Sequence, residues 1–300
     1  MTVIPQRPLG FGEILDGAIQ FYRRDFGLYF LIALVGALPA YAMLLALGTP
    51  STGIDAAGNP DFGGVGFDGL IVLLAMIVSW VGTVAVAVAM RARLEDGRAS
   101  LESAYRGVLR PFPSTLGAHL LAILLVGIAG FVLMLLGMML AVAVAAAGSL
   151  VLALVVFVPM GLAAALLVFA LWFSITFAIL PAVLLDGRSA SASLRRSFQL
   201  ARGARLRVLG IMLVVVIIQN AVSVGLFAFS GGFEMFTSPE TVGTVGGGWI
   251  AVQNTVELLI GALTTPFGVA TVFFLHHDRR VRLEASDLET TAAAMATDGP

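Results

Sequence analysis

Residues 116–185 read LGAHLLAILLVGIAGFVLMLLGMMLAVAVAAAGSLVLALVVFVPMGLAAALLVFALWFSITFAILPAVLL, and this stretch decides the fold. Its 70 consecutive residues include no Asp, Glu, Lys or Arg. A helix needs about 20 apolar residues to cross a bilayer, so the stretch is too long for one span. It can hold two long helices or three short ones, and hydropathy alone does not choose between them.

The composition of the whole chain is that of a membrane protein. Hydrophobic residues make up 59% of the chain and charged residues 12%, and the mean hydropathy is +1.00. A soluble domain carries roughly twice that share of charge. The chain has no cysteine, which excludes disulfides and thiolate metal sites.

The positions of the arginines indicate how many spans the stretch contains. All 17 basic residues are arginine, and they fall in four groups at 7–24, 91–110, 188–207 and 279–282. The loops at 49–68 and 231–249 contain acids but no arginine. The positive-inside rule then places the four groups and both termini in the cytoplasm of a bacterial cell. Three spans within 116–185 would move the third group outside, so we predict two spans that turn near Gly148 and Ser149.

The predicted fold is therefore an all-α polytopic membrane protein with six transmembrane helices. We place the spans at about 27–48, 69–90, 116–146, 150–185, 208–230 and 250–275. Residues 1–275 form a single membrane domain, and residues 276–300 form a cytoplasmic tail that we expect to be disordered after about residue 290.

An amphipathic segment precedes each odd-numbered span. Ile14, Ala18 and Tyr22 lie on one helical face of the first, and Leu101 and Tyr105 on one face of the second. Such helices lie in the membrane interface with the apolar face down. The tripeptide Asp-Gly-Arg also recurs at 96–98 and 186–188. The pattern indicates three units of interfacial helix, span and span, although any helix between a cytoplasmic loop and a bilayer has a similar pattern.

Three stretches carry a resemblance to a known family. They are RPLGFGEILDGAIQFYRRDF at 7–26, DGRSASASLRRSFQLARG at 186–203 and HDRRVRLEASDLE at 277–289. Together they resemble the membrane domain that precedes the catalytic barrel of some bacterial glycerophosphoryl diester phosphodiesterases, which also occurs in stand-alone relatives of unknown function. The pattern of the last stretch is matched at Asp278, Arg280, Arg282, Glu284, Asp287 and Leu288. It departs from that pattern at His276, His277, Ala285 and Ser286.

The resemblance implies a membrane module and not an activity. The catalytic barrel has its own His-Arg-Gly start and its own metal-binding acids, and the chain contains neither. Motifs for zinc proteases, phosphate-binding loops and serine hydrolases are also absent from the sequence. We therefore expect a protein that is not an enzyme, has no cofactor and does not hydrolyse glycerophosphodiesters.

His276, His277 and Asp278 raise the question of a metal site. Consecutive helical residues point about 100° apart, so two adjacent histidines do not face one ion. The only other imidazole in the chain is His119. We interpret the pair as an interfacial polar belt, and we expect no metal site.

The last two spans carry a candidate intramembrane polar cluster, formed by Gln219, Asn220, Ser223, Gln253, Asn254 and Glu257. An acid at this depth is costly unless it is paired, protonated or wet. One interpretation is a protonated Glu257 that hydrogen-bonds to Asn220 or Ser223 and joins the two helices. The other is a polar cavity for a substrate, a proton or a lipid headgroup.

The segment 186–207 is the most basic part of the chain. It contains six arginines and one aspartate, a local net charge of +5. We predict an anionic-lipid patch made by Arg195, Arg196, Arg202, Arg205 and Arg207. The alternating charges after residue 276 could pair with these arginines, through Asp287 or Glu284.

These observations favour a scaffold or a lipid- and envelope-associated accessory protein of the inner membrane. The alternative is a transporter or channel-like protein that uses the cluster around Glu257. The expected partner is the lipid bilayer, with its anionic headgroups, and we expect no nucleic acid partner.

Overall fold

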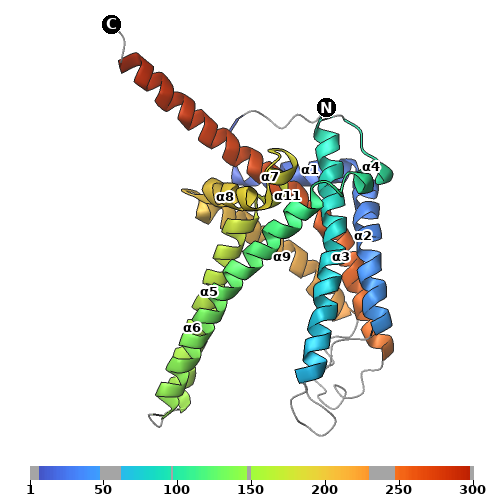
Figure 1. Ribbon diagram of the computed structural model, residues 1–300, viewed down its shortest axis with the longest axis vertical. Coiled ribbons are helices and arrows are strands. Elements are labelled where there is room, and N and C mark those ends of the chain that lie inside the picture. Colours follow the sequence, from blue (N-terminus) through green and yellow to red (C-terminus); the bar gives the residue numbers. More distant parts are fainter. Residues whose placement is uncertain (1–6, 48–61, 96, 147–149, 230–246, 298–300) are drawn as a thin grey trace. The chain divides into compact units, whose positions relative to one another are not determined.

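The computed structural model describes residues 7–47, 62–95, 97–146, 150–229 and 247–297, and these residues form helices without any strand (Figure 1). The helices are α1 (Phe11–Arg24), α2 (Phe26–Leu47), α3 (Phe62–Glu95), α4 (Leu101–Arg106), α5 (Phe112–Ala146), α6 (Leu150–Thr176), α7 (Ile179–Leu184), α8 (Ala190–Ala201), α9 (Arg205–Phe229) and α11 (Gly247–Thr297).

Within these described ranges, six helical stretches are long and apolar enough to cross a membrane, which confirms the predicted all-α polytopic fold. They lie in α2, α3, α5, α6 with α7, α9 and α11. The predicted turn at Gly148 and Ser149 lies outside the described residues. The last helix, α11, continues to Thr297, whereas the sequence predicts a tail that is disordered after about residue 290.

The fourth span is interrupted near its end, at Phe177 and Ala178. Pro181 explains the interruption, because proline has no N–H and its ring clashes with the carbonyl four residues earlier, that of Phe177. The amide of Ala178 is instead satisfied by the hydroxyl of Ser197 in α8, at 3.1 Å. The predicted span 150–185 is therefore two helices, α6 and α7, with α8 packed against both.

The chain divides into two compact units. The first contains residues 9–112 and 213–274, and in it α2 and α3 run side by side (Figure 1). Their closest approach is at Gly36 and Gly82, where a Cβ atom on Gly36 would lie 2.2 Å from the Cα atom of Gly82. Only glycine at both positions permits this contact.

The short helices of the first unit attach to its spans through tyrosines. The hydroxyl of Tyr22 in α1 donates to the Leu263 carbonyl of α11 at 2.8 Å, and that of Tyr105 in α4 donates to the Ile32 carbonyl of α2 at 2.7 Å. Burial raises the pKa of each tyrosine to about 12, so both remain donors at neutral pH.

The apolar face of α1 packs on protein. Ile14 and Ala18 are fully buried, and the Phe21 ring stacks on Tyr29 of α2 and meets the edge of Phe274 of α11. The sequence predicts an apolar face turned towards the membrane interface, but α2 and α11 cover this one. Amphipathic periodicity indicates that a face is buried without saying what buries it.

Asp25 fixes the junction between α1 and α2. Its carboxylate accepts hydrogen bonds from Arg93 near the end of α3, one of them from Nε at 2.8 Å. These hydrogen bonds hold the pKa of Asp25 below its usual range, against the opposing effect of burial.

The second unit contains residues 113–212 and 275–300, with α5 to α8 and the adjoining ends of α9 and α11. The glycine of the repeated Asp-Gly-Arg tripeptide is left-handed in both units: Gly97 has φ +67° and Gly187 has φ +63°. Each of these glycines follows the end of a span and precedes a short helix, α4 or α8. A left-handed glycine commonly ends a helix, so the two glycines occupy equivalent positions, between the end of a span and a short helix.

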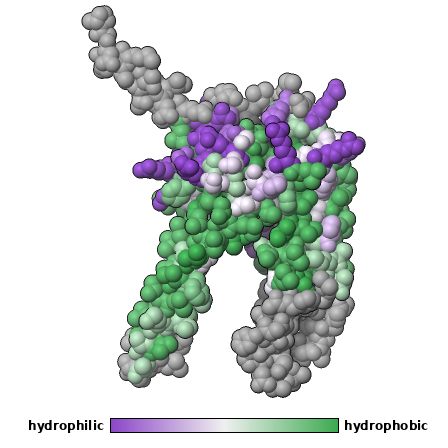
Figure 2. All heavy atoms as spheres, viewed as in Figure 1, coloured by the Kyte–Doolittle hydropathy of each residue, from purple (hydrophilic) through white to green (hydrophobic). Residues whose placement is uncertain are grey.

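The hydropathy of the surface differs between the short helices and the spans. In the space-filling view, hydrophilic residues gather around the short helices and the spans are hydrophobic (Figure 2). Much of this hydrophobic surface is exposed, as at Phe131, Met139 and Leu162, which is expected of side chains that face lipid.

Candidate functional site

Two groups of polar residues are candidates for a functional site, one in each unit. The first is an ionic cluster in the second unit, formed by Asp186, Arg196, Arg207, His276, Asp278, Arg279, Arg280 and Arg282. The second is a pocket in the first unit that Glu257 lines.

One face of α11 contributes His276 and Arg280, which are one helical turn apart. Both face Asp186, the first residue of the second Asp-Gly-Arg tripeptide. Nε2 of His276 lies 3.5 Å from Oδ2 of Asp186, and Nη1 of Arg280 lies 3.7 Å from Oδ1. Arg196 of α8 approaches Oδ2 at 3.7 Å. Burial alone would raise the pKa of Asp186, but these three neighbours outweigh it and hold that pKa below its usual range.

The opposite face of α11 contributes Asp278 and Arg282. Asp278 is fully buried, and Nε of Arg282 donates to its carboxylate at 2.9 Å. Nη2 of Arg207, at the start of α9, lies 3.4 Å from the same carboxylate. Residues two apart on a helix point in nearly opposite directions, so His276 and Asp278 face different neighbours. The α11 segment thus contacts the α7–α8 turn on one side and α9 on the other.

Arg279 between these faces caps α8. Its side chain is buried, and Nε donates to the Leu200 carbonyl at 2.8 Å while Nη2 donates to the Arg202 carbonyl at 3.3 Å. The last carbonyls of a helix lack partners within the helix, and a buried arginine satisfies them with a favourable charge.

The basic segment does bind the polar end of α11, but through Asp278 and Asp186. The proposed partners Glu284 and Asp287 have side chains outside the described residues. Asp186 was not among the predicted site residues, although its recurrence in the repeated tripeptide is a signal that marks it.

The predicted anionic-lipid patch is divided by this cluster. Arg196 and Arg207 are engaged with aspartates, whereas Arg195, Arg202 and Arg205 are exposed. Exposed apolar side chains accompany them: Phe198 is 42% exposed, under the Arg205 guanidinium at 5.1 Å, and Leu206 is 86% exposed.

The structure also separates the predicted intramembrane cluster. Asn220 and Ser223 donate to carbonyls of their own helix, those of Val216 and Gln219. Among the side chains that the structure describes, none hydrogen-bonds to Glu257, so the predicted bond from Asn220 or Ser223 is not formed. Helical spacing does not choose the rotamer of a side chain, and the rotamer that returns to its own backbone competes with the partner across the interface.

The side chain of Gln219 contacts the backbone of α11. Its Nε2 atom lies 3.4 Å from the Thr264 carbonyl, and Gly268 leaves the space that this side chain occupies. The neighbouring Leu263 carbonyl accepts from Tyr22. Both carbonyls belong to the turn before Pro266, where proline disturbs the helical ladder and outside donors commonly compensate.

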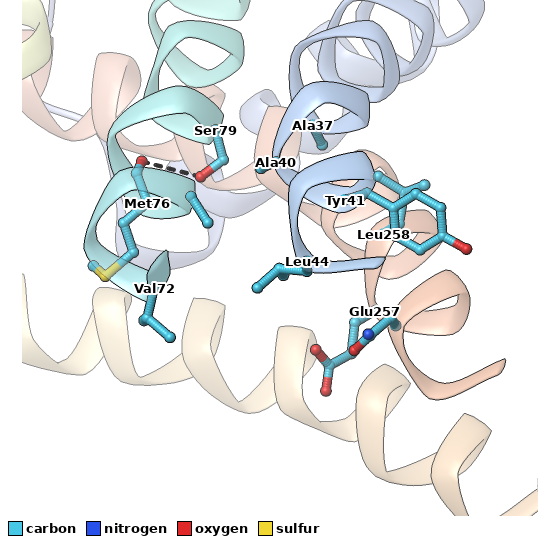
Figure 3. Close-up of a pocket in the computed structure, with 11 residues that line it drawn as sticks. Ala37, Ala40, Tyr41, Leu44, Val72, Met76, Ser79, Glu257 and Leu258 are labelled. Carbon is cyan, nitrogen blue, oxygen red and sulfur yellow. Dashed lines mark hydrogen bonds between the residues drawn. The ribbon is translucent and has the colours of Figure 1, made fainter. Parts of the chain in front are cut away.

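Glu257 and Asn254 line a pocket of about 330 Å³ between α2, α3 and α11 (Figure 3). The Glu257 side chain is exposed, and the side chain of Gln253 lies outside the described part of the chain. Tyr41 and Ser79, which the sequence did not single out, also line it. The hydroxyl of Tyr41 is 2.6 Å from that of Thr255, and Ser79 donates to the Met76 carbonyl at 3.1 Å.

No group of three or more His, Asp or Glu residues in the described parts of the chain is placed to hold a metal ion. His276 is buried against Asp186, and His277 is half-buried. The contacts of the ionic cluster join helices, and its arginines can attract an anion. The pocket beside Glu257 can accept a small molecule.

The helices and these sites define a polytopic α-helical membrane protein whose second unit contains an ionic cluster between the α7–α8 turn, α8, α9 and α11. A family model described as a domain of unknown function (DUF7847) matches residues 21–277, and the chain belongs to this family. No curated protein and no solved structure matches the chain.

Proposed function

We propose that this chain is a non-enzymatic protein of the bacterial cytoplasmic membrane that acts as a scaffold or accessory module and binds anionic lipid headgroups through residues 186–207. Both termini and the helices α1, α4 and α8 would then lie on the cytoplasmic side, as the arginine positions indicate.

The exposed part of the basic segment supports this function. Arg195, Arg202 and Arg205 are exposed, beside the exposed apolar side chains of Phe198 and Leu206. Arginines next to exposed apolar side chains suit the boundary between headgroups and acyl chains. Each basic residue near an anionic leaflet contributes about 1 kcal/mol of attraction.

The ionic cluster holds this surface in place. Arg279 caps α8, and Asp186 and Asp278 neutralise Arg196 and Arg207. The remaining arginines of the segment are thereby presented on a fixed backbone. The resemblance to phosphodiesterase membrane domains also supports an accessory role, since there the chemistry belongs to a separate barrel.

The test compares the purified protein in phosphatidylcholine nanodiscs with and without phosphatidylglycerol. We expect phosphatidylglycerol to raise the Tm of the wild type and to have little effect on the triple variant Arg195→Gln, Arg202→Gln, Arg205→Gln. The matched control is Arg98→Gln, Arg106→Gln, Arg110→Gln, which changes the charge equally at another exposed group. Equal losses in both variants would show general attraction to the leaflet and would refute a site at 186–207.

A second candidate is a transporter or channel-like protein. The pocket beside Glu257 favours it, because a transporter needs a binding site within its spans.

A further inference from the structure

The pocket beside Glu257 is created by small side chains on two close-packed helices. Gly36 and Gly82 bring α2 and α3 into backbone contact. Over the next turns the facing residues are Ala37 and Ala40 on α2 and Ala75 on α3, which are too small to fill the space. In the close-up, Ala37 and Ser79 lie towards one end of the pocket, and Leu44 and Glu257 towards the other (Figure 3).

The walls are mostly aliphatic, with one charge. Glu257 is the one carboxylate among the described lining residues, and no basic residue is among them. The chain has no lysine, and its arginines occur in the four groups outside this region of the sequence. Of the other polar lining residues, Tyr41 and Ser79 already have hydrogen-bond partners, and the Asn254 amide carries no charge.

None of the described side chains that line the pocket carries a charge that could balance the carboxylate. A charge in an apolar layer is costly unless a proton or a counter-ion neutralises it. Asn220 and Ser223, the candidate donors across the interface, donate to their own helix instead. A ligand that carries both a positive charge and an aliphatic chain would complement the carboxylate and the walls together.

We propose that this pocket binds a lipophilic organic cation, an ammonium group on an aliphatic chain. The ammonium lies against Glu257 and the chain lies along Ala37, Ala40 and Leu44. A phosphate on the ligand would meet no basic residue among the described lining, so a simple amphiphilic amine fits better than an aminophospholipid. This inference is independent of the lipid-binding surface at 186–207 and deepens the transporter candidate by naming its substrate class.

The test is equilibrium binding of radiolabelled tetradecyltrimethylammonium to the protein in phosphatidylcholine nanodiscs, corrected for empty nanodiscs. We expect saturable binding to the wild type and a loss of affinity on the order of tenfold in Glu257→Gln, since one charge pair in an apolar site is removed. Glu102→Gln is the matched control, because Glu102 is exposed on α4, outside the spans. Unchanged affinity in Glu257→Gln, or equally strong competition by uncharged tetradecanol, would overturn the proposal.

A second variant keeps Glu257 and changes the apolar lining of the pocket. Ala37→Leu narrows the pocket, and we expect it to weaken binding of the long-chain cation; binding equal to that of the wild type would also refute the site. If phosphatidylethanolamine competes with the labelled cation, the natural ligand is a lipid with an ammonium headgroup. If phosphatidylethanolamine does not compete, the natural ligand is a free amphiphilic amine. Phosphatidylglycerol stabilisation of the wild type and of the triple variant at Arg195, Arg202 and Arg205 shows separately whether the proposed lipid surface at 186–207 fails.

Discussion

Arg279 shows how an arginine in a run of arginines can differ from its neighbours. It follows Asp278 in a stretch that also contains Arg280 and Arg282, and from the sequence all three fix the cytoplasmic side in the same way. In the structure Arg279 is 7% exposed and donates to two backbone carbonyls, whereas the side chain of Arg280 is 47% exposed in a 3.7 Å ion pair.

Arg279→Gln should therefore destabilise the protein far more than Arg280→Gln. Hydrogen bonds from a charged group are worth about 1.5–3 kcal/mol, so we expect Arg279→Gln to lose roughly 2–3 kcal/mol. Arg280→Gln should lose less than about 1 kcal/mol, because an exposed ion pair contributes little. Unfolding of both variants in a neutral detergent measures the difference. Equal losses would show that Arg279 acts through its charge alone and not as the cap of α8.

For individual residues, the sequence indicates which residues form polar contacts better than it indicates which residues they contact. The pairing between the α11 motif and the basic segment follows from the alternation of charge, but the partner is Asp278 because the helix turns that side chain towards Arg207. Gln219 was assigned to the polar cluster with Glu257, yet its side chain reaches the backbone near Pro266. Such partners depend on rotamers and on contacts between distant segments, which local periodicity does not contain.

Among the elements, the α2–α3 pair depends most directly on residue size. A Cβ atom on Gly36 would lie 2.2 Å from the Gly82 Cα atom and 2.8 Å from the Tyr105 hydroxyl. Backbone cannot move away as a flexible side chain can, so the helices must separate, and the hydrogen bond from Tyr105 to Ile32 is lost with them.

We expect Gly36→Ala to cost about 1–3 kcal/mol of stability, the usual range for overpacking. Gly127→Ala in α5 is the control, since a Cβ atom there meets nothing within 4 Å. Alanine has the higher helix propensity, so this control should be neutral or slightly stabilising. Thermal unfolding of the two variants in the same detergent measures both effects. If Gly36→Ala were as stable as the control, the close contact would be incorrect.

The elements themselves were largely predictable. Hydropathy and arginine positions predict the six spans. The repeated Asp-Gly-Arg tripeptide predicts the start of a short helix at two places, and in both places its glycine, Gly97 or Gly187, is left-handed. The break before α7 was not predicted, because a proline near a span end can either kink a helix or end it. The Ser197 hydroxyl, which receives the freed amide of Ala178, lies 19 residues away on another helix.

For the whole molecule, the decisive property is the side of the membrane on which each loop lies. Six spans return the chain to its starting side, so the four arginine groups and both termini share one side if the stretch at 116–185 forms two spans. A third span there would place 188–207 outside and reverse everything that follows. The two topologies differ in the placement of residues around 191 and 238.

The chain has no cysteine, so single cysteines can report these placements directly. We expect a membrane-impermeant thiol reagent to label intact cells that carry Ser51→Cys, Ser149→Cys or Ser238→Cys. Ala99→Cys and Ser191→Cys should be labelled only after the membrane is permeabilised. We expect the arginine-rich segments to stay inside, because moving them outward opposes both the membrane potential and the attraction of the anionic leaflet. Labelling of Ser191→Cys in intact cells would contradict the two-span assignment. It would also place the surface at 186–207 away from the cytoplasmic leaflet, whose anionic lipids it is proposed to bind.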